Sequence, residues 1–103
     1  LAIASGARSQ AMPDLPTVAE AGLPGFKAEV WFGVVAPAGT PSAIVSRLSG
    51  EMGQIIRTPD VQKQLLSQGI EPMTSTPEEF TAFIRAEIAK WAELVKKTGA
   101  RVD

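Results

Sequence analysis

The chain has 103 residues, of which 45% are hydrophobic and 20% are charged, and its formal net charge is −1. This length fits one domain or half of one, and the hydrophobic share is sufficient for a core. Because positive and negative residues are interspersed, the sequence offers neither a basic patch for nucleic acid nor a polybasic segment for a membrane surface. The chain contains no cysteine and no histidine, which excludes disulfides, Ser-His and Cys-His catalysis and histidine-bound metals within it.

The N-terminal part of the chain predicts a strand, a short helix and a second strand. Residues 1–5 are small and apolar and stop at Gly6, which favours a short buried strand. Thr17 and Glu20 have the spacing of a capping box, and Gly22 offers a left-handed stop that leaves room for one or two helical turns. Residues 26–36 are rich in β-branched and aromatic side chains and predict the clearest strand of the chain.

Three Thr-Pro pairs then predict the starts of three helices. Thr40-Pro41, Thr58-Pro59 and Thr76-Pro77 each place an N-cap hydroxyl before a proline at the first helical position, where its missing N–H is not needed. Apolar residues recur in these segments at spacings of three and four, as in amphipathic helices.

The later elements complete an alternating order. The second helix is expected over residues 60–67, and Gly69 separates it from a short strand over residues 70–74. The last helix begins with a Thr76 to Glu79 capping box and ends at Gly99. The predicted order is β-α-β-α-α-β-α, which indicates an α/β layer architecture rather than a helical bundle.

Three segments together resemble one known family. DLPTVAEAGLPGF (14–26), WFGVVAPAGTP (31–41) and TPEEFTAFIRAEIAKWAELVKKTG (76–99) are similar, in this order, to the C-terminal part of the periplasmic solute-binding receptors of tripartite tricarboxylate transporters, the Bug-type proteins. The resemblance runs from Ala2 to Val102. Because such receptors are much longer, it implies that the chain is a fragment.

The resemblance also implies a fold. It is the type II periplasmic-binding-protein fold, in which two α/β lobes enclose a cleft. Residues 1–25 would end the second lobe, residues 26–35 would form the strand that crosses the hinge, and residues 36–103 would complete the first lobe.

The function implied by the resemblance is that of a transport receptor, not an enzyme. Such a receptor captures a small carboxylated metabolite in the periplasm without a cofactor and presents it to the membrane components of its transporter. The periplasmic location implies a signal peptide. Residues 1–4 have neither the charged region nor the long apolar segment of one, so the signal peptide is expected upstream. The main loops that grip the carboxylate are expected in the N-terminal part of such receptors, outside this sequence.

The residues themselves offer little for catalysis or metal binding. Glu78 and Glu79 are adjacent rather than facing, and their place in a first helical turn explains them as capping and dipole residues. Asp and Glu nowhere have the spacing of a metal-binding loop, and residues 5–8 lack the glycine pattern of a phosphate loop. The sequence predicts no catalytic residue, no metal and no nucleotide.

Six residues are candidates for ligand binding. Ligands of open α/β sheets bind beyond the carboxyl ends of strands, where Ser5 and Gly6 would offer a hydroxyl and a backbone N–H to a carboxylate. Arg8 is the nearest cation, although a loop arginine is more often simply solvated. The resemblance places Trp31, Phe32 and Gly33 at the junction of the lobes, where a cleft forms; aromatic residues of an apolar strand more often belong to a core, and both interpretations stay open.

Two other classes of function are compatible with these residues. One is the C-terminal domain of an enzyme that acts on acyl or carboxylate substrates, with its catalytic residues upstream. The other is an interaction module whose last helix docks a partner through Phe80, Ile84, Ile88 and Trp91. A fragment would also leave apolar faces and a strand edge uncovered, which predicts that the chain associates as a dimer.

Overall fold

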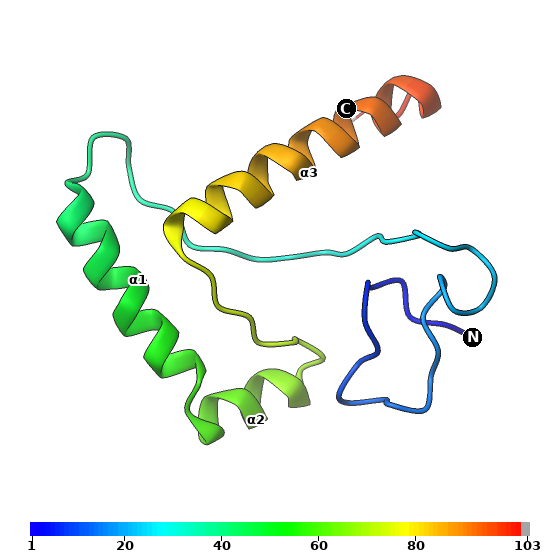
Figure 1. The fold of residues 1–103 in the computed structure, drawn as a ribbon, viewed down its shortest axis with the longest axis horizontal. Helices are drawn as coiled ribbons and strands as arrows, with labels where there is room; N and C mark the ends of the chain where they lie inside the picture. Colours follow the sequence, from blue (N-terminus) through cyan, green and yellow to red (C-terminus); the bar gives the residue numbers. More distant parts are fainter. Residues whose placement is uncertain (102–103) are drawn as a thin grey trace.

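The computed structural model describes residues 1–101, so Val102 and Asp103, on which the family resemblance and the predicted first-lobe segment end, lie outside the described residues. Within that range the chain forms three helices: α1 (Ser42–Ile56), α2 (Pro59–Ser67) and α3 (Pro77–Thr98). All three were predicted from the Thr-Pro pairs and are confirmed. α1 contacts both α2 and α3, and the N-terminal loops lie at the opposite end of the molecule from α1 (Figure 1).

The start and end of α3 are those that the sequence predicts. The Thr76 hydroxyl accepts a hydrogen bond from the Glu79 N–H at 3.1 Å, and the Thr76 N–H donates to the Glu79 carboxylate at 3.3 Å. Gly99 ends the helix with a φ of 68°, a left-handed conformation that glycine adopts without a side-chain clash.

The N-cap hydroxyls predicted for the other two helices do not act as caps. The residue at the N-cap of α1 is Pro41, and the Thr40 hydroxyl donates to the Pro37 carbonyl at 2.7 Å instead. Thr58 is the N-cap of α2, but its hydroxyl donates to the Ile55 carbonyl at 2.6 Å. In both cases a backbone carbonyl of the preceding turn accepts the hydrogen bond from the hydroxyl. In α2 the proline, at the first helical position, favours the helix start instead.

The three predicted strands do not form within residues 1–101, so the predicted order β-α-β-α-α-β-α is not reproduced there. Residues 1–5 contribute one isolated parallel bridge, between Ile3 and Thr17. Residues 26–36 run extended past α3, and residues 70–74 are irregular (Figure 1). The physical reason is pairing: β-branched composition favours extended backbone, but a strand exists only beside a partner that shares its ladder of hydrogen bonds.

The predicted short helix is a single turn. The Thr17 to Glu20 capping box is present, with the Thr17 N–H donating to the Glu20 carboxylate at 2.8 Å and the Glu20 N–H donating to the Thr17 hydroxyl at 3.1 Å. One i to i+4 bond follows, from the Ala21 N–H to the Thr17 carbonyl at 3.0 Å. Gly22 then turns the chain away with a φ of 133°.

The described residues enclose no fully buried hydrophobic side chain, although the composition is sufficient for a core. The radius of gyration is 16.4 Å, whereas a compact domain of this length would have about 13 Å. Large apolar side chains of the extended segment are open to solvent, among them Val30, Phe32 and Val35. The helices and the extended segment thus present apolar faces that nothing in residues 1–101 covers.

Two contacts join the N-terminal loops to the helical part. The Glu71 carboxylate, after α2, accepts hydrogen bonds from the Ser9 hydroxyl and the Gln10 N–H, both at 2.9 Å. The Lys90 ammonium of α3 donates to the backbone carbonyl of Lys27. These bonds fix where the N-terminal polar groups lie relative to the helices.

Candidate functional site

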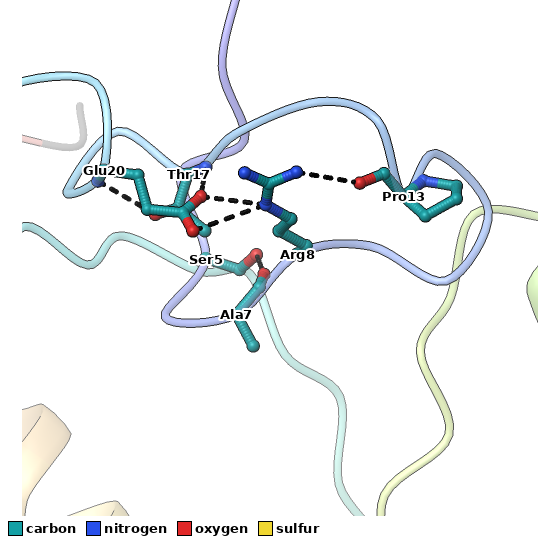
Figure 2. A network of polar contacts seen from close by, with 6 residues as sticks. All are labelled: Ser5, Ala7, Arg8, Pro13, Thr17 and Glu20. Atoms are coloured by element: carbon teal, nitrogen blue, oxygen red, sulfur yellow. Dashed lines mark hydrogen bonds and ion pairs between the residues drawn. The ribbon is translucent and has the colours of Figure 1, made fainter.

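The predicted N-terminal binding residues lie on one polar loop, and each is already engaged by the chain itself. The Ser5 hydroxyl donates to the Ala7 carbonyl at 2.6 Å. The Gly6 N–H donates to the Glu29 carboxylate at 3.0 Å. The Arg8 guanidinium donates to Glu20 and, at 3.2 Å, to the Pro13 carbonyl (Figure 2). The loop therefore has hydrogen-bond donors of the kind that bind carboxylates. In this structure the donors are bound to carbonyl and carboxylate oxygens of the chain itself.

The Arg8 and Glu20 pair is the centre of that loop. The Arg8 Nε lies 3.0 Å from one Glu20 carboxylate oxygen and 3.4 Å from the other. The same carboxylate accepts the Thr17 N–H (Figure 2). The Thr17 backbone hydrogen bond and then Arg8 lower the pKa of Glu20, so this carboxylate stays ionised at a lower pH than an ordinary glutamate does.

Lys27 and Glu29 complete a second polar group that the sequence analysis did not identify. The Lys27 ammonium lies 3.8 Å from the Glu29 carboxylate, and that carboxylate binds the Gly6 N–H. The signal was present in their spacing, because residues two apart in an extended segment share a face. Nothing in the sequence alone placed that face against Gly6.

The predicted aromatic residues divide between a cluster and an open surface. Trp31 packs edge-on against Phe80 and Phe83 of α3, with ring centroids 5.7 and 5.2 Å away. Gly33 lies against the Phe80 ring so closely that a Cβ on Gly33 would clash with the Phe80 Cζ. Phe32 is 83% exposed. Trp31 thus contacts two rings of α3 and is still 38% exposed.

A hollow of about 470 Å³ lies between the extended segment, α1 and α3. Its walls are mainly apolar and include Phe32, Gly33, Leu48, Met52 and Ile84. Trp31 does not line it, and neither do Ser5, Gly6 or Arg8. The structure therefore places the six predicted residues in two separate regions, a polar loop and an apolar face.

The apolar stripe of α3 is only partly available for a partner. Phe80 and Ile84 are half-buried and line the hollow. Trp91 is half-buried, and its Nε1 donates to the Glu87 carboxylate at 2.7 Å. Ile88 is 64% exposed. The four residues of the predicted docking face thus do not present one continuous open surface.

Residues 1–101 contain no group of three or more side chains that could ligate a metal ion. In the same range, no helix combines the length and the apolar character that a membrane crossing requires.

Comparison with known families gives a match over almost the whole chain. The model of the tripartite tricarboxylate transporter family receptor, TctC, matches residues 1–100.

Relatives of known sequence match over a similar extent. Protein BugT of Bordetella pertussis is 39% identical over 102 residues, which are 99% of this chain and 31% of BugT. A UPF0065 protein from the tcbD–tcbE intergenic region of Pseudomonas sp. strain P51 is 40% identical over 96 residues, which are 92% of this chain and 29% of that protein. The chain therefore spans about a third of the length of these relatives.

Two solved structures have a similar fold. The structure of R. palustris Rpa4515 with adipate gives a TM-score of 0.77 at 35% identity. The match covers 96% of this chain and 33% of the Rpa4515 chain. The structure of the periplasmic binding protein BugD gives a TM-score of 0.73 at 35% identity. The match covers 93% of this chain and 33% of the BugD chain. The path of this chain is therefore that of a third of a periplasmic binding protein.

Proposed function

The chain belongs to the tripartite tricarboxylate transporter receptor family, and we propose that it is the C-terminal part of a receptor that captures a small carboxylate for such a transporter. The observation that carries the proposal is the family match over residues 1–100 together with the similar structure that holds adipate. Because the chain spans about a third of its relatives, binding and delivery are proposed for the longer protein.

The proposed architecture is a type II periplasmic-binding-protein fold with two lobes. Residues 1–25 end one lobe, residues 26–35 cross the hinge, and residues 36–103 complete the other. The path of the chain agrees with this division, because the extended segment 26–36 leads from the N-terminal polar loops to the three helices (Figure 1). In the longer protein this segment gains strand partners, and its exposed apolar side chains become buried.

The proposed ligand is a small acid bound by its carboxylates. Ser5, Gly6 and Arg8 lie on a loop with hydroxyl, amide and guanidinium donors, and each carboxylate oxygen prefers such donors, above all charged ones. Trp31, Phe32 and Gly33 contribute apolar contacts at the junction of the lobes. The two regions would supply the polar and the apolar walls of one interdomain site.

The proposed location is the periplasm, and the proposed partner is the membrane part of a tripartite tricarboxylate-type transporter. Support comes from BugD, a periplasmic binding protein with a similar structure, and from the family description, which names the transporter. No part of the proposal requires a cofactor, since carboxylate capture is hydrogen bonding and charge pairing alone.

The experiment that tests this proposal compares this chain with a receptor of full family length that contains it. Both are screened by thermal shift against small mono-, di- and tricarboxylates, with the diamide of adipic acid as the uncharged control. Ligand at about 100 times its dissociation constant stabilises a protein by about 2.7 kcal/mol. Stabilisation of the longer receptor by a carboxylate and not by the diamide is the expected result; a folded receptor that no carboxylate stabilises would refute the proposal.

A further inference from the structure

We propose that Gly6 and Lys27 form a carboxylate-binding subsite, and that the chain's own Glu29 carboxylate occupies this subsite until a ligand carboxylate replaces it. The inference rests on the proposed receptor function and goes beyond it by naming a second cation, Lys27, and an internal competitor, Glu29.

The first observation is that a carboxylate is already bound to the Gly6 amide. The Gly6 N–H donates to Glu29 Oε1 at 3.0 Å across 23 residues of sequence. Hydrogen bonds from a backbone N–H to an ionised carboxylate are about twice as strong as those between neutral groups. The amide therefore has the direction and access that a ligand carboxylate would need.

The second observation is the position of the Lys27 ammonium. It lies 3.8 Å from the other carboxylate oxygen, Glu29 Oε2. A Cβ on Gly6 would stand 3.4 Å from Lys27 Cδ and 3.8 Å from its Nζ, so the lysine side chain covers Gly6. One carboxylate thus has an amide on one oxygen and a cation near the other, a two-point arrangement that an uncharged group would not satisfy equally.

Contacts of the backbone hold the subsite of Gly6 and Lys27 in place from both sides. The Ala28 N–H donates to the Ala4 carbonyl at 2.8 Å, which sets the segment of Lys27 and Glu29 beside the Gly6 loop. The Lys90 ammonium of α3 binds the Lys27 carbonyl. The subsite is therefore positioned by main-chain contacts that do not depend on the Glu29 side chain.

The Glu29 carboxylate is held more loosely than the carboxylate that Arg8 binds. The Glu29 side chain is 30% exposed, and one hydrogen bond and a distant ammonium hold its carboxylate. Arg8 donates to both oxygens of Glu20 and to the Pro13 carbonyl. A ligand would displace an ion-paired carboxylate at either cation, but the Arg8 pair is closer, at 3.0 Å against 3.8 Å for Lys27, and Arg8 also donates to the Pro13 carbonyl. This difference favours Lys27 over Arg8 as the cation of the site.

The experiment follows the Gly6 amide resonance of the 15N-labelled chain during a titration with acetate. Acetate has one carboxylate, so the subsite alone is sufficient to bind it, and acetamide is its uncharged control. Removing the competing negative charge by Glu29→Gln should weaken the bond to the Gly6 N–H and shift the Gly6 resonance, and acetate should shift it back. One hydrogen bond corresponds to about three- to tenfold in an equilibrium constant, so Glu29→Gln should bind acetate about three- to tenfold more tightly than wild type. Lys27→Met in the Glu29→Gln background should reverse that gain.

Two controls keep the interpretation clear. Glu93→Gln removes another acid that pairs with a lysine, Lys97 on α3, and it should leave the titration unchanged. The Ala28 amide resonance reports whether the subsite stays folded. If Glu29→Gln disturbs it, Glu29→Asp takes its place, because the shorter side chain keeps its charge but reaches Gly6 less well. A Gly6 resonance that acetate leaves unmoved in both Glu29 variants would overturn the inference. The receptor proposal would stand or fall separately, by the carboxylate screen of the longer protein.

Discussion

Arg8 and Glu20 form an ion pair across the N-terminal loop, with the Arg8 Nε 3.0 Å from Glu20 Oε2, and the same carboxylate closes the Thr17 turn. One side chain thus links two local structures: the capping box of a single turn and the loop that contains Ser5 and Gly6 (Figure 2). The arginine that the sequence offers as a ligand group is here paired with a capping glutamate.

The first prediction concerns the pH dependence of this loop. The Thr17 N–H and Arg8 lower the pKa of Glu20. A carboxyl with a lowered pKa stabilises the folded loop only when it is ionised, so this stabilisation is complete above the usual glutamate pKa of about 4.3. It is lost as the pH falls through the lower pKa of the folded state.

Amide hydrogen exchange measured against pH checks this. The Thr17 and Glu20 amides should lose protection as the solution becomes strongly acidic, and Glu20→Gln should have weak protection at every pH. Equal acid sensitivity in wild type and Glu20→Gln would show that another group is responsible.

The second prediction concerns the start of α3. Glu79 belongs to the capping box with Thr76, whereas the neighbouring Glu78 makes no such bond. Loss of an N-cap threonine costs about 1 kcal/mol, so Thr76→Ala should reduce the helix content of α3 measurably, and Glu79→Ala should do so to a smaller extent. Glu78→Ala keeps the box and is the matched control. Circular dichroism and exchange of the Phe80 amide measure the effect; equal losses from Glu78→Ala and Glu79→Ala would mean that helix-dipole charge, not the box, is what matters.

How far the sequence predicts this structure depends on whether a feature is local. The box of Thr76 and Glu79 was predictable because its partners lie three residues apart. The strand over residues 26–36 was not realised, because composition describes the segment and says nothing of the neighbour that must pair with it. The Arg8 to Glu20 pair and the Gly6 to Glu29 bond were likewise missed, since they join residues 12 and 23 positions apart.

The third prediction concerns Gly33. Its backbone lies against the Phe80 ring, so Gly33→Ala must displace that ring or the extended segment. Forcing a methyl group into packed space costs about 1–3 kcal/mol, and the Trp31 contacts with Phe80 and Phe83 should loosen. Trp31 fluorescence in a Trp91→Phe background should then shift to longer wavelength.

Gly50→Ala is the control for that substitution. Gly50 lies in α1 with no heavy atom within 4 Å of the position of a Cβ, so alanine there should be neutral or should stabilise the helix. Adding Phe80→Ala to Gly33→Ala should relieve the clash. Unchanged Trp31 emission in Gly33→Ala would contradict the close approach.

The last prediction concerns the uncovered apolar face. Phe32 is 83% exposed and Val35 is 75% exposed on an extended segment without a ladder partner (Figure 1). Exposed apolar area and unpaired backbone groups both favour association with another chain. We therefore expect the isolated chain to associate with itself, whereas a receptor of family length, in which the added chain covers this face, should remain monomeric.

Sedimentation over a wide concentration range separates these cases. Burying a phenylalanine side chain contributes about 1.5–3 kcal/mol, so Phe32→Ser should weaken association of this chain by about ten- to hundredfold. Met12→Ser, at an exposed position of the N-terminal loop, is the control and should leave association unchanged. A compact monomer at every concentration would contradict the prediction, because it would require the 103 residues to close a core of their own. Association that Phe32→Ser leaves intact would instead place the contact on α3, where Ile88 is the exposed apolar residue.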